Sequence, residues 1–111
     1  MGERGMVVLH YGSQYADQGV AIYTHSWGHR IREIVDEIVG SNVFQARMHT
    51  PGYAARIFID QFTKDSRDID TGYGVYPVQM AGDLGEGSFD LNYPAVHVDL
   101  TNGKVWQETW R

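Results

Sequence analysis

The chain has 111 residues, a formal net charge of −5 and no cysteine. This length suits one domain with its own core, and the absence of cysteine excludes disulfide scaffolds, thiolate metal sites and cysteine nucleophiles. The acidic balance argues against nucleic-acid binding, which rests on basic side chains that displace counterions. No apolar run is long enough for a signal peptide or a membrane span. We therefore expect one cytoplasmic domain over residues 1–111, without nucleic-acid or membrane partners.

The N-terminal part predicts a β-hairpin followed by a helix. Residues 6–11 and 19–25 are rich in β-branched and aromatic side chains and are separated by a polar loop. Residues 29–39 then carry apolar side chains at helical spacing, at Ile31, Ile34, Val35, Ile38 and Val39. Gly40 is placed to end this helix.

The remainder predicts a second helix and three strands. Residues 51–62 form the helix, because Pro51 suits a first turn. The strands are expected within 74–80, 89–100 and 104–110, and a loop is expected over 82–88. Asn102-Gly103 predicts a type I′ hairpin turn between the last two strands. The order strand, strand, helix, helix, strand, strand, strand favours an α+β fold, with an antiparallel sheet of about five strands and two helices on one face.

The junction between the second strand and the first helix holds the densest group of polar functional side chains. They are His25, Ser26, Trp27, His29, Arg30 and Arg32. Unpaired amides at a helix start favour a bound anion, and arginines there oppose the helix dipole unless an anion offsets them. The pattern predicts an anion or nucleotide site. The alternative is local structure: Ser26 caps the helix, Trp27 packs on the sheet and Arg32 pairs with Asp36.

Three further side chains extend this predicted site. Arg56 can run its stem along the core edge and present its guanidinium to a ligand. Tyr73 and Tyr76 flank a glycine and can stack on a planar group, although tyrosines on a sheet also serve ordinary packing.

Histidine chemistry is the competing interpretation. His25 and His29 are four residues apart, and a metal would need His10, His49 or His97 as a third ligand. Gly28 argues against helical spacing of that pair, so no metal or other cofactor is expected. His97 and Asp99 share one strand face, which leaves a histidine-based or metal-dependent hydrolase as an alternative, and no catalytic residue is assigned.

Residues 20–28, 52–57 and 71–77 together resemble a family. They are similar to small phage- and prophage-encoded proteins of unassigned function, which carry a strand followed by Tyr-x-His-Trp-Asp-Gly. The resemblance implies a viral accessory protein that binds a host protein or sequesters a defence signal, often as an oligomer. We therefore expect a non-enzymatic binding protein for a nucleotide-like anion or a host protein. A structural subunit is a further alternative, and a homodimer would cover the strand edges.

Overall fold

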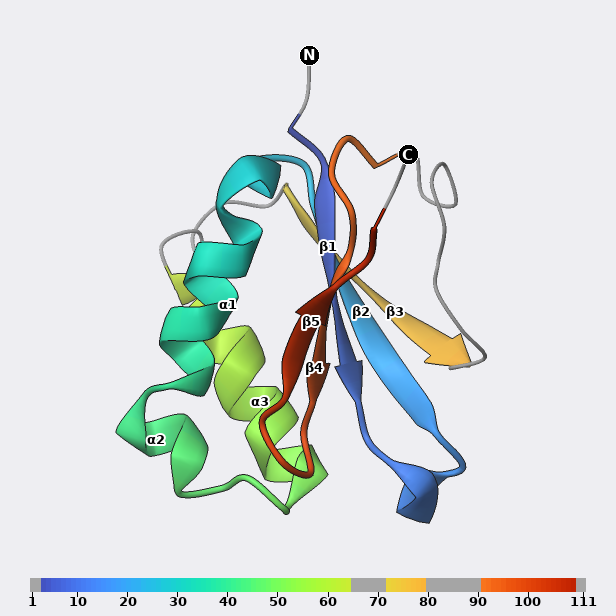
Figure 1. Cartoon of the computed structure of the whole chain (residues 1–111), viewed down its shortest axis with the longest axis vertical. Coiled ribbons are helices and arrows are strands. Elements are labelled where there is room, and N and C mark those ends of the chain that lie inside the picture. Colours follow the sequence, from blue (N-terminus) through green and yellow to red (C-terminus); the bar gives the residue numbers. More distant parts are fainter. Residues whose placement is uncertain (1–2, 65–71, 80–90, 110–111) are drawn as a thin grey trace.

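A five-stranded sheet with helices on one face forms the domain in the computed structural model, which describes residues 3–64, 72–79 and 91–109 (Figure 1). The strands are β1 (Gly5–His10), β2 (Gln18–Thr24), β3 (Tyr73–Gln79), β4 (Val96–Asp99) and β5 (Val105–Gln107). The helices are α1 (Ile31–Val39), α2 (Asn42–Gln45) and α3 (Pro51–Phe62), with 3-10 turns η1 (Ser13–Tyr15) and η2 (Gly28–Arg30). The predicted α+β class is confirmed. The short helix α2 was not predicted.

The spatial order of the strands is β3-β2-β1-β4-β5. Neighbours are antiparallel except β1 and β4, which run parallel from Val7 opposite Val96 to His10 opposite Asp99. The expectation of a purely antiparallel sheet is therefore wrong for this pair. Period-two alternation looks the same in parallel and antiparallel strands, so the sequence pattern does not encode strand direction.

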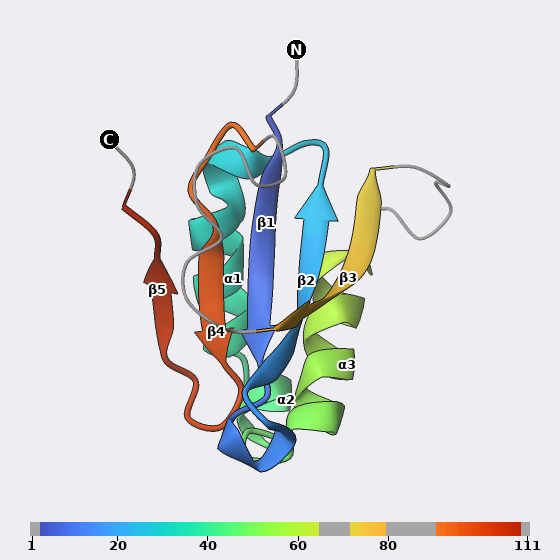
Figure 2. The ribbon, with the colours of Figure 1, turned by 90° about the vertical axis from the view of Figure 1, so that its right-hand side faces the viewer.

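The main core lies between the sheet and the helices. Figure 2 shows α1 and α3 behind the sheet, with its other face toward the viewer. Val7 and Leu9 of β1 point to the helix side and are fully buried against Val35 and Phe58 and their neighbours. The predicted alternation of faces along β4 is confirmed, because Val96 and Val98 join this core while His97 faces the opposite way.

The helix-free face carries a smaller apolar cluster. Met6, Val8 and Ala21 are fully buried there, beside Leu91 and Ala95. His10, which ends β1, and His97 of β4 lie on this same face, next to that cluster. Two titratable side chains therefore lie against apolar ones.

The ends of several elements differ from the predictions. α1 begins at Ile31, because the preceding three residues form η2 instead of α-helix. In the described part of the strand expected over 89–100, only β4 is strand, and it begins after Pro94, which has no N–H for a ladder. No helix among residues 3–64, 72–79 and 91–109 is long and apolar enough to cross a bilayer.

The C-terminal hairpin is confirmed, but its turn is not type I′. Only Gly103 has left-handed backbone (φ 77°), whereas type I′ requires it at both central residues. The Gly103 N–H donates to the Asp99 carbonyl at 2.7 Å, and the Asn102 side-chain oxygen accepts from the Lys104 N–H at 2.8 Å. The predicted loop over 82–88 lies outside the described residues.

Candidate functional site

The predicted junction is anchored to the chain that precedes β1. The Gly28 N–H donates to the Glu3 carbonyl at 2.7 Å, and Trp27 before it has left-handed backbone (φ 70°) with a side chain 52% exposed. Ser26 does not cap α1: its N–H donates to Thr24 Oγ1, and its carbonyl accepts from that hydroxyl. The predicted cap is therefore wrong, because η2 separates Ser26 from the helix. Trp27 is half exposed and lies outside the buried core.

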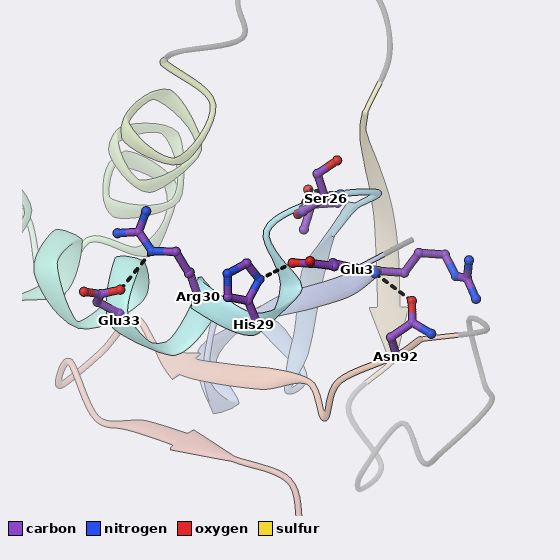
Figure 3. Close-up of polar contacts among 8 residues, drawn as sticks. Glu3, Ser26, His29, Arg30, Glu33 and Asn92 are labelled. Atoms are coloured by element: carbon purple, nitrogen blue, oxygen red, sulfur yellow. Dashed lines mark hydrogen bonds and ion pairs between the residues drawn. The ribbon is translucent and has the colours of Figure 1, made fainter. Parts of the chain in front are cut away.

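Three basic side chains of the junction lie against carboxylates of the same region, and Figure 3 shows the pairs made by His29 and Arg30. The pairs are His29 with Glu3, Arg30 Nε with Glu33 Oε1 at 3.0 Å, and Arg32 Nε with Asp36 Oδ2 at 3.2 Å. The predicted Arg32–Asp36 pair is confirmed. An anion at this helix start would compete with these carboxylates, so the charge pattern that motivated the site has a local explanation.

Some of the predicted residues meet in one groove, which we call the junction groove. It encloses about 680 Å³ and is lined by Trp27, Arg30, Ile34, Glu37, Ile38, Ser41, Gln61, Phe62, Lys64 and Tyr73. Tyr73 packs edge-on against Phe62 at 5.8 Å between ring centroids. The lining carries the carboxylate of Glu37 beside the cations of Arg30 and Lys64, and the carboxylate offsets part of their attraction for an anion.

Other predicted residues lie apart from that groove. Tyr76 pairs with Ala21 of the helix-free face, three residues along β3 from Tyr73, so the two tyrosines point to opposite sides of the sheet. Tyr73 and Tyr76 therefore do not stack together on one planar ligand, contrary to expectation. His25 is exposed and its Nδ1 lies 3.1 Å from the Tyr23 hydroxyl.

Arg56 occupies a different hollow, which we call the Arg56 hollow. It encloses about 540 Å³ and is lined by Gln14, Tyr15, His49, Thr50, Pro51, Gly52, Tyr53 and Arg56. No carboxylate is among these lining residues, and Arg56 has no ion-pair partner among the residues that the structure describes. Tyr15 and Tyr53 are 47% and 60% exposed.

A hydrogen-bonded chain of three titratable side chains lies on the helix-free face. Glu108 Oε2 is 2.7 Å from His97 Nε2, and His97 Nδ1 is 2.8 Å from His10 Nε2. The side chains of His97 and Glu108 are each 1% exposed, whereas His10 is half-buried. From the sequence, His97 and Asp99 were predicted for this face, and His10 was considered only as a metal ligand. Glu108 was missed, although β-strand alternation would have placed it on the same face as Trp106.

The environment of His10 lowers its basicity. Burial, and secondarily the neighbouring His97, lower the pKa of His10 to about 4, and the carboxylates of Asp99 and Asp17 oppose this in part. His10 is therefore neutral at pH 7. Within the described part of the chain, no three His, Cys, Asp or Glu side chains are arranged to hold a metal ion.

Comparison with known proteins finds no relative of this chain. No family model matches the sequence, and no curated protein or solved structure matches it. Function is accordingly inferred from the residues themselves.

Proposed function

We propose that this protein is a binding module for a small planar anion of the nucleotide type, and that the Arg56 hollow is its site. The observation that carries the proposal is the placement of Arg56. It is a cation without a carboxylate partner in the described chain, in a hollow flanked by two exposed tyrosines.

The chemistry of the hollow suits both halves of a nucleotide. A guanidinium presents a planar fork of N–H donors that matches phosphate oxygens, while the exposed rings of Tyr15 and Tyr53 offer faces for a base. Arg47 lies over one face of the Tyr53 ring, 5.2 Å from its centroid, which leaves the opposite face for a base. A volume of about 540 Å³ falls within the range of small-molecule sites.

The junction groove is the less suitable of the two places. Its arginine is already paired with Glu33, and Glu37 lines the wall. The proposal therefore keeps the ligand class expected from the sequence and moves the site to Arg56. In the setting implied by the resemblance to phage proteins, the module would act in the host cytoplasm by withdrawing a small anionic signal.

Thermal unfolding with a panel of mononucleotides and cyclic dinucleotides tests this proposal. A ligand bound only by the folded state, at about 100 times its Kd, stabilises by about 2.7 kcal/mol, which raises the Tm of a domain of this size by on the order of 10 °C. Arg56→Gln and Tyr53→Ala should each abolish the shift. Arg32→Gln and Tyr76→Ala are the matched controls, because both side chains lie outside the hollow.

The pattern across variants separates the two sites. Loss of the shift in Arg30→Ala with Arg32→Ala, but not in Arg56→Gln, would return the site to the junction and contradict this assignment. The absence of a shift with every compound would overturn the ligand class itself. A host protein sought by pull-down would then be the leading partner.

A further inference from the structure

With Glu108 ionised and both histidines neutral, the chain Glu108–His97–His10 has only one consistent arrangement of protons. A carboxylate can only accept, so His97 Nε2 carries the proton of the 2.7 Å bond to Glu108. His97 Nδ1 is then an acceptor, and His10 Nε2 must donate across the 2.8 Å bond between the rings. The remaining nitrogen, Nδ1 of His10, is left with its lone pair.

That last nitrogen is the solvent-facing end of the chain. Nδ1 of His10 has no hydrogen-bond partner among the described residues, and within the described part of the chain no buried side-chain nitrogen or oxygen lacks one. His10 also ends β1 beside Asp99 of β4, the one parallel pair of the sheet.

We propose that Glu108, His97 and His10 form a proton-accepting relay, with Nδ1 of His10 as a general base for a neutral or cationic substrate. The proton taken from the substrate binds Nδ1 of His10, and the proton on Nε2 of His10 passes to Nδ1 of His97. His97 is then an imidazolium that donates to the Glu108 carboxylate, and His10 is again neutral. One proton is gained in total, and its charge ends beside the buried carboxylate.

The surroundings of His10 explain why a relay is useful there. Burial disfavours a proton kept on His10 itself, which is the main reason that its pKa is lowered to about 4. Transfer to His97 places the positive charge against Glu108, where opposite charges at hydrogen-bond distance stabilise it. The carboxylates of Asp99 and Asp17 favour positive charge at His10, which suits a neutral or cationic substrate better than an anionic one.

A purely structural role is a weak explanation of this chain. A buried polar contact of this kind is weak evidence for stability, because apolar side chains of similar volume can often replace it, and the chain adjoins the apolar cluster of Met6 and Val8. Perturbed titratable groups with specific partners are instead typical of functional sites. The relay is independent of the Arg56 hollow and adds a catalytic activity to binding.

The probe for a general base is 5-nitrobenzisoxazole, a neutral planar compound. The base removes the carbon-bound hydrogen as a proton, the ring N–O bond breaks, its electron pair leaves on oxygen as a phenolate, and a nitrile forms. The rate is read from phenolate absorbance at pH 7.

General-base catalysis commonly contributes about 10²- to 10⁴-fold to a rate, so His10→Gln should lower the elimination rate at least tenfold, and Glu108→Gln should also lower it. His25→Gln is the matched control, an exposed histidine bonded to Tyr23, and should leave the rate unchanged.

The outcomes decide the proposal even where a variant fails to fold. Equal rates for the parent and His10→Gln would overturn the base, and an unchanged rate in Glu108→Gln would overturn the relay. If Glu108→Gln does not fold, imidazole ¹⁵N shifts of the parent are followed through an acid titration. A relay requires the rings of His10 and His97 to change together in the first protonation step, because that proton belongs to the pair, whereas a first step confined to His10 would contradict it. Arg56→Gln should keep the full elimination rate, which separates this proposal from the ligand site.

Discussion

The imidazole of His97 stacks on the indole of Trp106, with ring centroids 5.1 Å apart and ring planes within 8°. The two residues are register partners on β4 and β5. The same indole lies 5.0 Å from the ring of His10, and the Lys104 ammonium lies 5.7 Å from its centroid. Trp106 thus contacts both histidines and contributes to the burial of the chain.

Replacing Trp106 with alanine should raise the pKa of His10. Burial is the largest cause of the lowered value, and removing the indole lets water reach the imidazole. A histidine-detected NMR titration measures the effect, and Trp106→Phe should retain most of the lowered pKa because a ring remains. An unchanged midpoint in Trp106→Ala would show that other groups bury His10.

The free energy of unfolding should decrease as the pH falls from about 6.5 to about 4. The pKa of His10 is about 4 in the folded protein, against an ordinary value of 6.5 for a solvated histidine, so the unfolded chain binds more protons in this window. His10 therefore favours folding above pH 6.5, and its contribution is lost on acidification. Urea unfolding across this range should give a shallower pH dependence for His10→Gln than for the parent. Parallel curves would contradict the lowered pKa.

Two serines that both precede helices should differ in their effect on stability. Ser41 caps α2, because its hydroxyl accepts from the Phe44 N–H at 3.4 Å and donates to the Ile38 carbonyl at 2.6 Å. Ser41→Ala should cost about 1 kcal/mol. Ser26→Ala should cost less than about 0.5 kcal/mol, as for an ordinary surface position, because only the backbone of Ser26 bonds to Thr24. Chemical denaturation compares them, and equal losses would restore Ser26 as a cap.

Two glycines form a second matched pair. A Cβ on Gly28 would lie 2.4 Å from the Glu3 carbonyl oxygen and 2.7 Å from a ring carbon of Tyr93, so Gly28→Ala must displace backbone and destabilise the junction. A Cβ on Gly52 in α3 meets nothing within 4 Å. Gly52→Ala should stabilise by about 0.4–1 kcal/mol, since alanine restricts the unfolded chain. Thermal unfolding of both variants checks this, and a stable Gly28→Ala would show that the contact with Glu3 relaxes easily.

Local pattern was sufficient for most elements of the fold. The apolar spacing of α1, the start of α3 at Pro51 and the alternation of Val96, His97 and Val98 each depend on neighbours along the chain. Capping and turn type were less predictable: η2 displaces Ser26 from α1, and Gly103 alone supplies the left-handed backbone of the last turn.

The sequence by itself determined the fold class, the helix faces and the two faces of β4, because periodicity follows from backbone geometry and the burial of apolar side chains. The tertiary structure decided which charges meet. It divides Tyr73 from Tyr76, moves Arg56 away from the junction, and joins His97 to His10 and to Glu108 across 87 and 11 residues. The contact of His10 with His97 depends on the parallel register of β1 with β4, and strand direction leaves no signature in the alternation of side chains.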